Sequence, residues 1–392
     1  MPVKRVIYAA SVMREEEFAA LFDGGHNIPG QQAQKFNRLM VAGIEKNGAE
    51  AFVISAPPVT AKNCARRLVA LGQKRIGNTV YRYLPILNLP RIKNPLVILS
   101  SFFHTLFAAA FRKSAVVCDV LNVSVAMGAV AAGRLLHKPC VGIVTDVPEL
   151  MVTGHTDKQV RFCHKIIENC THYVFLTEAM NERLNPDRKP YTIIEGVCNE
   201  DLSYEDRPSA GERICFYAGL LDAEYGVKTM VDAFRRAAVP GARLQICGKG
   251  PYAEELARIA AEDPSVEYLG TLMNSEVVAL EKKAALLINP RPSVGEFTKF
   301  SFPSKVMEYM TSGTAVFATK LPGIPEEYYH YIYPISDESE EGMAESLRNV
   351  LSLSDEELIH KGRLAYRFVT ENKSAAAQAS KLLSLMAVKS NA

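Results

Sequence analysis

Short apolar runs rich in β-branched residues alternate along the whole chain with longer segments whose apolar residues have helical spacing. Strands that are apolar on both faces and separated by helix-length segments are typical of parallel sheets covered by helices on each side. The predicted strands are Arg5–Ala10, Ala51–Ser55, Val80–Leu84, Val116–Val120, Val141–Thr145, Tyr173–Leu176 and Tyr191–Ile194 in the first half, and Ile214–Ala218, Arg243–Cys247, Val266–Leu269, Ala285–Asn289, Ala315–Thr319 and Ile332–Ile335 in the second. The pattern predicts an α/β protein with two doubly wound sheets.

A polar stretch at 199–213 interrupts this alternation near the middle of the chain. Because 392 residues exceed what one hydrophobic core usually organises, two domains are expected. The sequence therefore predicts a first domain over 1–198, a linker over 199–213 and a second domain over 214–373. The segment 374–388 carries an apolar helical stripe, and we expect it to pack back on the protein, with the first domain as the candidate surface.

Charge and composition narrow the function classes. The 45 Lys and Arg residues against 43 Asp and Glu give a net charge of +2, which argues against a nucleic-acid partner. The first apolar stretch, Val6–Ala10, is shorter than a secretion signal, and the longest apolar run, Pro95–Phe111, is shorter than the ~20 residues of a membrane-spanning helix. The eight cysteines form no CxxC pair, and the spacing from Cys163 to His172 suits no common zinc site. We therefore expect a cytoplasmic protein with reduced thiols.

Glycine-bearing turns follow the first two predicted strands of the second half. Gly219 opens the first turn, and Gly248-Lys249-Gly250 forms the second, directly after a strand. Glycines at a strand-to-helix turn let backbone N–H groups approach a phosphate, and a lysine can reach a diphosphate as a mobile cation. An ordinary turn with a solvated lysine explains the second piece equally well when it is taken alone.

A longer motif, PRPSVGEFTKFSFPSKVMEYMTSG, follows the strand that ends at Asn289. Ser301 is the predicted N-cap of a short helix, and Gly313 is its predicted left-handed stop. This helix places Ser304 and Glu308, four residues apart, on one face. A carboxylate there can accept hydrogen bonds from both hydroxyls of a ribose, while the helix N-terminus attracts the phosphates. The alternative for Glu308 is a solvated surface carboxylate.

Taken together, "YAGLLDAEYGVKTMVDAF", "ICGKGPYAEEL", "LINPRPSVGEFTKFSFPSKVMEYMTSGTAVFAT" and "LPGIPEEY" resemble the retaining glycosyltransferases of family four. The resemblance is close over residues 214–327, and "VIYAAS", "VGIVTDVPEL", "YVFLTEAM" and "IIEGV" match more loosely in the first half. It implies the GT-B fold, two Rossmann-like domains that face a cleft. It also implies a hexosyltransferase-type enzyme that moves a sugar from a nucleoside-diphosphate sugar, UDP-linked by default, to a sugar or lipid-linked saccharide acceptor in polysaccharide or glycoconjugate synthesis.

The resemblance assigns roles to individual residues of the second half. Glu308 matches the last Glu of the family's Glu-x7-Glu pair, which holds the nucleotide ribose, and the Gly-x-Gly-Pro stretch lies near the nucleotide in that family. Position 300, where the first Glu should stand, is Phe300, and Tyr225 replaces a basic residue before the glycine of the first loop. The candidates to replace the missing donor contacts are Arg291, Lys299 and Lys305.

No Asp-x-Asp metal signature occurs in the chain. By the GT-B pattern we therefore expect neither a metal nor a cofactor. Helix N-termini and cations would then meet the charge of the diphosphate.

Two first-half features acquire candidate roles from the same resemblance. The loop at Pro29, Gly30 and Gln31 matches one that faces the donor diphosphate, although a surface loop explains it equally well. Asp146 follows the strand 141–145, near which the family places a catalytically important polar residue, commonly His. Its alternative is a helix cap or turn former. His155 is a weaker candidate, for which solvent exposure is the default.

The segment 81–113 mixes Arg and Lys with a long apolar helix pattern. A helix that is apolar nearly all round is expected to be core, and we favour that interpretation. The alternative is peripheral contact with the inner face of a membrane, because cations flanking an apolar helix can seat a protein on anionic lipid. Two alternatives to glycosyl transfer also stand: a GT-B sugar-nucleotide epimerase, and an inert GT-B binding or scaffold protein, which Phe300 favours.

Overall fold

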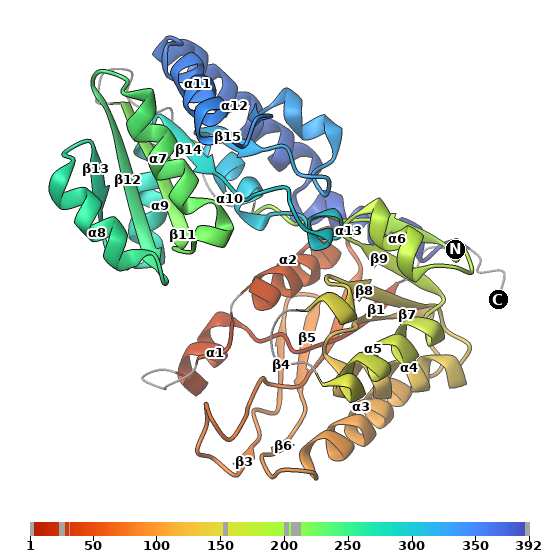
Figure 1. Cartoon of the computed structure of the whole chain (residues 1–392). Coiled ribbons are helices and arrows are strands. Elements are labelled where there is room, and N and C mark those ends of the chain that lie inside the picture. The colour runs from red at the N-terminus through yellow and green to blue at the C-terminus, as the bar shows by residue number, and fades with distance from the viewer. Residues whose placement is uncertain are drawn as a thin grey trace. The chain divides into compact units, whose positions relative to one another are not determined.

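The computed structural model describes residues 4–22, 28–30, 32–151, 156–199, 204 and 213–388. The chain divides into two compact units (Figure 1). Unit 1 comprises Met1–Val197 together with Ser374–Ala392, and unit 2 comprises Cys198–Lys373. Each unit has its own sheet with helices on both faces, so the predicted α/β class with parallel sheets is confirmed. Most of the predicted linker 199–213 lies outside the described residues.

Unit 1 is built on an eight-stranded sheet in the order β10-β9-β8-β7-β1-β2-β5-β4. Its strands are β1 (Arg5–Ala10), β2 (Glu50–Ser55), β4 (Gln73–Ile76), β5 (Thr79–Tyr83), β7 (Ser114–Asp119), β8 (Cys140–Val144), β9 (His172–Phe175) and β10 (Tyr191–Ile193). Neighbouring strands are parallel except at the edge, where β4 runs antiparallel to β5. The direction of winding reverses between β1 and β7, so this is the switch point of unit 1.

Helices cover both faces of that sheet. They are α1 (Glu15–Phe22), α2 (Gln32–Lys46), α3 (Lys93–Ala109), α4 (Val123–Leu135), α5 (Asp157–Asn169), α6 (Glu178–Leu184) and α13 (Ala375–Leu385). The chain's last helix, α13, belongs to unit 1 and packs on α2 so closely that a Cβ at Gly43 would lie 1.9 Å from the Ala375 carbonyl oxygen. On the other face α3 packs against α4, where a Cβ at Gly128 would lie 2.2 Å from the Ile98 carbonyl oxygen.

Unit 2 has a six-stranded parallel sheet in the order β13-β12-β11-β14-β15-β16. Its strands are β11 (Arg213–Leu220), β12 (Ala242–Lys249), β13 (Val266–Tyr268), β14 (Leu286–Asn289), β15 (Ala315–Thr319) and β16 (Tyr333–Ile335). Its helices are α7 (Val227–Ala237), α8 (Ala253–Glu262), α9 (Asn274–Lys283), α10 (Ser304–Ser312), α11 (Glu340–Leu351) and α12 (Asp355–Asn372). This strand order is that of a dinucleotide-binding Rossmann sheet, with its switch point between β11 and β14.

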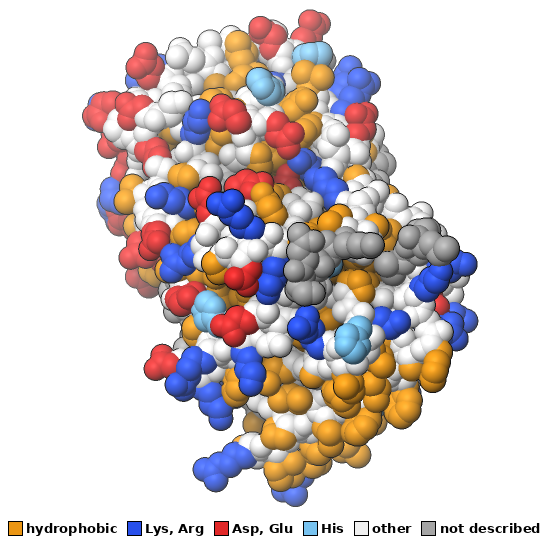
Figure 2. Space-filling model, turned by 90° about the vertical axis from the view of Figure 1, so that its right-hand side faces the viewer, with side chains coloured by type: hydrophobic (Ala, Val, Ile, Leu, Met, Phe, Trp, Pro, Cys, Tyr) orange, Lys and Arg blue, Asp and Glu red, His pale blue; other side chains and the backbone are white. Residues whose placement is uncertain are grey.

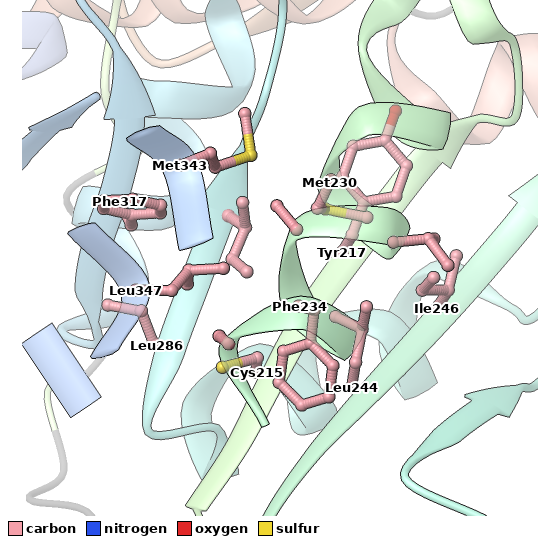
Figure 3. Packing of buried hydrophobic residues seen from close by; sticks show 14 of the residues in the cluster. Cys215, Tyr217, Met230, Phe234, Leu244, Ile246, Leu286, Phe317, Met343 and Leu347 are labelled. Carbon is pink, nitrogen blue, oxygen red and sulfur yellow. The ribbon is translucent and has the colours of Figure 1, made fainter. Parts of the chain in front are cut away.

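The core of unit 2 shows why the sequence adopts this layering. Figure 3 shows Met230 and Phe234 of α7 and Leu347 of α11 lying over strand residues such as Leu244 and Leu286. All are buried, because the helices place their apolar residues at helical spacing toward strands that are apolar on both faces. The core therefore fixes the strand ends from which the loops at the switch point emerge.

Every strand that the hydrophobic pattern predicts is present, with ends shifted by a few residues. The pattern misses β4, which is exposed throughout, and the two-residue strands β3 (Leu68–Val69) and β6 (Ile86–Leu87), which pair with each other. These strands are too short or too polar to give an apolar signal.

The interpretation of the apolar helix within 81–113 as wholly core is wrong. In α3, Val97, Ser101 and Thr105 are buried, and the Ser101 hydroxyl donates a hydrogen bond to the Val125 carbonyl oxygen of α4 at 2.7 Å. The opposite side exposes large apolar side chains, because α4 covers only one side of α3.

Candidate functional site

The loops that follow β11 and β14 meet at the switch point of unit 2. Gly226 has a left-handed φ of 79°, and a Cβ there would lie 2.1 Å from the Pro290 carbonyl oxygen. Only glycine therefore fits, and the close approach brings the first glycine turn beside the start of the long third motif. Ligands of open α/β sheets bind at such a point, outside the carboxyl ends of the strands.

Backbone also packs against backbone at the ends of β11 and β12. Gly219 is the register partner of Gly248, whose φ is 145° and whose added Cβ would lie 1.8 Å from the Gly219 carbonyl oxygen. Gly250 has a φ of 159° and a Cβ there would lie 2.2 Å from the Leu221 carbonyl oxygen. Lys249, the last residue of β12, is exposed at this edge. The glycines thus allow the ends of β11 and β12 to pack closely beside an exposed cation.

Lys305 reaches the same edge from α10. Its Cε lies 3.1 Å from the position of a Cβ on Gly219, and its Nζ lies 5.8 Å from the centroid of the Tyr309 ring. Burial raises the pKa of the Cys247 thiol to about 11, and the positive charge of Lys305 acts in the opposite direction. The ammonium group is therefore close to the ends of both β11 and β12.

The start of α10 differs from the prediction. Pro303, in extended conformation, is the N-cap, not Ser301, and it makes no side-chain cap hydrogen bond. The helix does not start before Pro303 because helical dihedrals are disfavoured for the residue that precedes a proline, here Phe302. Gly313 ends the helix with a φ of 80°, as predicted. With a proline as the cap, the first-turn amides receive no side-chain acceptor from it.

Tyr309 fixes α10 to the sheet. The Ala218 amide of β11 donates a hydrogen bond to the Tyr309 hydroxyl at 3.1 Å, and burial raises the pKa of this fully buried hydroxyl far above its ordinary value. On the same helix Ser304 is exposed and Glu308 is half-buried. The Glu308 carboxylate is near enough for its charge to raise the pKa of Tyr309 further. Glu308 is thus not a fully solvated carboxylate.

Arg291 is held by aromatic rings from both loops. Its guanidinium carbon lies 5.0 Å from the ring centroid of Phe297 and 5.9 Å from that of Tyr225. These are cation–π distances, which restrict the side chain of Arg291 and orient its charge. Two of the residues that the sequence singled out, Arg291 and Tyr225, are therefore brought together.

The loop that leads from Arg291 to α10 is held by hydrogen bonds within the loop. The Thr298 hydroxyl, buried, donates to the Gly295 carbonyl oxygen at 2.7 Å. Lys299 is exposed at the end of the 3-10 turn Glu296–Lys299, and Phe300 is half-buried immediately after it. Phe300 thus stands at the sequence position where a carboxylate was expected.

The candidates of unit 1 lie on separate loops. Pro29 and Gly30 precede α2, and a Cβ at Gly30 would meet no atom within 4 Å. Asp146 is exposed, two residues after the end of β8 and before the 3-10 turn Pro148–Leu150. Gln31 and His155 lie outside the described residues.

Sequence reasoning missed a buried polar network at the switch point of unit 1. The Tyr8 hydroxyl donates to Asn37 Oδ1 at 2.6 Å, and Asn37 Nδ2 donates to Asp119 Oδ2 at 3.2 Å. Asn122 Nδ2 also donates to Asp119, while Asn122 Oδ1 accepts from the Ser11 amide at 2.9 Å. The signal available in the sequence was an aspartate ending an apolar strand, with asparagine three residues later. The network ties the segment after β1 to the segment after β7.

Asp119 is fully buried within this network. Burial raises the pKa of its carboxyl above the ordinary value, and hydrogen bonds from Asn37, Leu121 and Asn122 oppose that shift. Its oxygens are all directed at donors of its own unit, which is the arrangement of a structural carboxylate.

The described residues contain neither a cluster of metal-ligating side chains nor a membrane-spanning helix. Within 4–22, 28–30, 32–151, 156–199, 204 and 213–388, no three His, Cys, Asp or Glu side chains are grouped as a metal site would require. No helix in that part of the chain is both long and apolar enough to cross a bilayer.

Comparison with known proteins supports the fold of the whole chain and a glycosyltransferase domain in unit 2. Residues 212–353 match the family model of "Glycosyl transferases group 1". Among curated proteins, none matches the chain significantly in sequence. Solved structures match nearly the whole chain, and the sucrose-phosphate synthase of Thermosynechococcus elongatus is 16% identical with a TM-score of 0.64 over 97% of this chain and 98% of that one.

Two other matching structures also cover nearly the whole chain. The α,α-trehalose 6-phosphate synthase of Burkholderia multivorans is 11% identical with a TM-score of 0.62, over 99% of this chain and 98% of that one. Anabaena HepE in complex with UDP-glucose is 13% identical with a TM-score of 0.60, over 97% and 99%. These matches confirm the predicted GT-B fold.

Proposed function

We propose that the protein is a retaining, metal-independent glycosyltransferase of hexosyltransferase type. It binds a nucleoside-diphosphate sugar at the switch point of unit 2 and transfers the sugar to a saccharide or lipid-linked saccharide, in polysaccharide or glycoconjugate synthesis in the cytoplasm. The observation that carries this proposal is α10. Its uncapped first turn, its cation and its half-buried carboxylate stand at the switch point, within the segment that matches the glycosyltransferase family model.

The nucleoside end of the donor is assigned to Glu308. A ribose presents two adjacent hydroxyl donors, and one carboxylate can accept both hydrogen bonds. The partial burial of Glu308 favours this use, because a partly dehydrated carboxylate gains more from such bonds than a fully solvated one. Ser304 lies one turn earlier on the same helix, so it can approach the adjoining phosphate.

The diphosphate is assigned to the glycine turns and the cations beside them. Gly248 and Gly250 let the turn after β12 pack directly on the backbone of Gly219 and Leu221, and the first turn of α10 presents its amides. Lys305 and Lys249 supply positive charge. When the bond from the anomeric carbon to the phosphate oxygen breaks, negative charge grows on the departing diphosphate, and these groups stabilise it. No metal ion is required for this step.

The sugar end is assigned to the loop 290–300. Arg291, oriented by Phe297 and Tyr225, and Lys299 take over contacts that the family's first Glu and its basic residue supply. The acceptor is assigned to unit 1, and the resemblance assigns Pro29, Gly30 and Gln31 to the donor diphosphate and Asp146 to catalysis. The acceptor oxygen attacks the anomeric carbon on the face from which the diphosphate leaves, and a phosphate oxygen takes the acceptor proton.

The choice of a uracil nucleotide rests on related structures. HepE was solved with UDP and with UDP-glucose, and a matching trehalose-phosphate synthase is described as UDP-forming. Their identities to this chain are 11–13%, so they support the class of donor and leave its sugar open.

Product analysis tests the proposal. The protein is incubated with a panel of labelled UDP-sugars, with and without saccharide and lipid-linked saccharide acceptors, and the products are separated by mass. We expect a glycosylated acceptor and free UDP only when both substrates are present, with the α linkage of the donor retained in the nuclear magnetic resonance spectrum.

Two outcomes would replace the proposal. Conversion of a UDP-sugar to its epimer without any acceptor would indicate the sugar-nucleotide epimerase. Nucleotide binding without transfer across the panel would indicate the inert binding protein, for which Phe300 at the expected Glu position is the motivating residue.

A further inference from the structure

One side of α3 exposes a row of large apolar side chains. The row, which we call the α3 face, consists of Ile92, Leu96, Leu99, Phe103, Phe107 and Phe111, all of them exposed. Leu96, Leu99, Phe103 and Phe107 follow each other at three- and four-residue steps, so they share one face of the helix. Phe107 is 75% exposed, and Phe111 is completely exposed.

This exposure is a property of the fold and not of a frayed end. The opposite side of α3 is buried against α4 through Val97 and Ser101. On the α3 face, Phe103 and Phe107 stack on each other at 6.5 Å between ring centroids. A continuous apolar row of this length on a soluble surface marks an interaction site more often than a chance cluster.

The chain around the α3 face has an unusual charge. Between Ala51 and Thr145 there are twelve Lys and Arg residues and a single acidic residue, the buried Asp119, whereas the whole chain has a net charge of only +2. Some of these cations have partners, since Lys74 forms an ion pair with Glu17. The excess of positive charge is nevertheless concentrated in the part of the chain that contains α3.

Exposed arginines stand at the N-terminal end of the α3 face. Arg91 immediately precedes Ile92 and is exposed. Arg66 and Arg67 are also exposed, and the Asn88 amide donates to the Arg67 carbonyl oxygen at 2.7 Å, which ties them to the segment that leads into α3. The neighbouring Leu68, in β3, is 61% exposed. At the other end Arg112 and Lys113 follow Phe111 and are exposed.

Figure 2 shows hydrophobic side chains gathered over the lower part of unit 1, with Lys and Arg side chains at the margin of this area. Figure 1 places α3, β3 and β6 at this end of unit 1. An apolar surface bordered by cations is the arrangement of a helix that lies in the plane of a membrane.

We infer that the α3 face docks unit 1 on the surface of a bilayer rich in anionic lipid. The apolar row enters the boundary between headgroups and acyl chains, and Arg66, Arg67 and Arg91 meet lipid phosphates. The helix lies on the membrane and does not span it, consistent with the lack of a spanning helix among the described residues.

The positive charge around the α3 face favours an anionic bilayer over a second copy of the chain as its binding partner. A symmetric dimer through the α3 face would bring the same cations of two copies toward each other, at a cost in repulsion. An anionic bilayer instead offers negative charge at every point around the apolar row. This inference is independent of the proposed transferase activity.

Vesicle sedimentation tests it with the full-length protein. Binding is measured to phosphatidylcholine vesicles with and without phosphatidylglycerol, at low and high salt. We expect binding at least about tenfold tighter to the vesicles that contain phosphatidylglycerol, because several cations near an anionic surface each add to the affinity. Binding should be weaker at high salt, because salt screens these charges.

Substitutions separate the apolar and ionic contributions. Phe103→Ser together with Phe107→Ser should weaken binding to the anionic vesicles at least about tenfold, and Arg66→Ser together with Arg67→Ser should remove most of the preference for phosphatidylglycerol. Met273→Ser, at a residue of unit 2 that is 72% exposed, is the matched control and should leave binding unchanged. Equal melting temperatures would show that the variants remain folded, since all of these side chains are exposed.

Three results would overturn the inference. One is absence of binding to vesicles of either kind. Another is binding that the two phenylalanine substitutions leave unchanged while the protein stays folded. The third is a dimer in light scattering that these substitutions dissociate, because the α3 face would then serve contact between copies.

Discussion

The two switch points of the molecule are built in opposite ways. In unit 1 the point between β1 and β7 is filled by a buried polar network around Asp119, whose hydrogen-bonding groups are directed at each other. In unit 2 the loops at the point between β11 and β14 pack closely through glycines, and Lys305 and Arg291 bring positive charge to these loops. Two similar switch points therefore carry a buried polar network in one unit and closely packed glycine turns with nearby cations in the other.

This difference indicates which of the two similar sheets is better suited to bind a ligand. A network that satisfies its own donors and acceptors has little capacity left for a ligand and serves to position loops. Glycines that allow close backbone approach, with cations held nearby, are suited to a polyanion. This contrast supports the proposed assignment of the donor to unit 2.

The largest expected effect comes from filling the glycine contact of unit 2. Gly248→Ala places a Cβ 1.8 Å from the Gly219 carbonyl oxygen, so β11 or β12 must shift, and we expect unit 2 to lose about 3 kcal/mol or more of stability. Gly270→Ala is the matched control, since it also has positive φ but meets no atom within 4 Å, and it should cost about 1 kcal/mol. Urea unfolding measures both, and equal losses would show that the close contact does not matter.

A smaller loss is expected at the junction of unit 1. Asp119→Ala leaves the side-chain amides of Asn37 and Asn122 without their acceptor, and we expect it to cost about 2 kcal/mol in urea unfolding. Asp187→Ala, at an exposed aspartate of the same unit, should change stability by less than about 0.5 kcal/mol.

The pH dependence of the Asp119 effect has a definite sign. Because burial raises the folded-state pKa of this carboxyl, its contribution is fully present below the ordinary Asp pKa and is lost as pH rises through the raised folded-state pKa. The difference in the free energy of unfolding between the natural protein and Asp119→Ala should therefore become smaller as pH rises from the ordinary Asp pKa through the raised folded-state pKa. A gap that widens there would contradict a raised pKa.

The smallest effect is expected when one of the aromatic rings beside Arg291 is removed. Phe297→Ala removes the nearer ring, and because an exposed cation–π contact is worth about 0.5–1 kcal/mol, UDP-sugar should bind about two- to fivefold more weakly. Val294→Ala, in the same loop and 80% exposed, is the control and should leave calorimetric affinity unchanged. Tighter binding in Phe297→Ala would show that the ring hinders the donor.

The sequence was sufficient for the fold, and for unit 2 it also identified the loops that come together. Apolar runs locate the strands, and glycines at strand ends mark the turns, because both signals are local. The start of α10 at Pro303 and the network around Asp119 were not predictable in this way. They depend on partners distant in the sequence: Asn37 is 82 residues from Asp119, and no local pattern records that contact.

The α3 face illustrates the same limit in another form. The apolar pattern of α3 predicts a helix correctly but does not say how much of it a neighbour covers. Coverage depends on α4, which buries the side that contains Ser101 and leaves Phe107 exposed. Periodicity alone could not distinguish a core helix from one that is half covered.

The most direct test of the central claim compares UDP with 2′,3′-dideoxy-UDP by calorimetry, in the natural protein, Glu308→Ala and Lys305→Met. If Glu308 holds the ribose, the natural protein should bind UDP about 10- to 100-fold more tightly than the dideoxy compound, whereas Glu308→Ala should bind both equally. Lys305→Met should weaken both ligands and keep the preference for UDP. Unchanged UDP affinity in Glu308→Ala, or a preference for UDP that survives in it, would contradict the assignment of the nucleotide to α10.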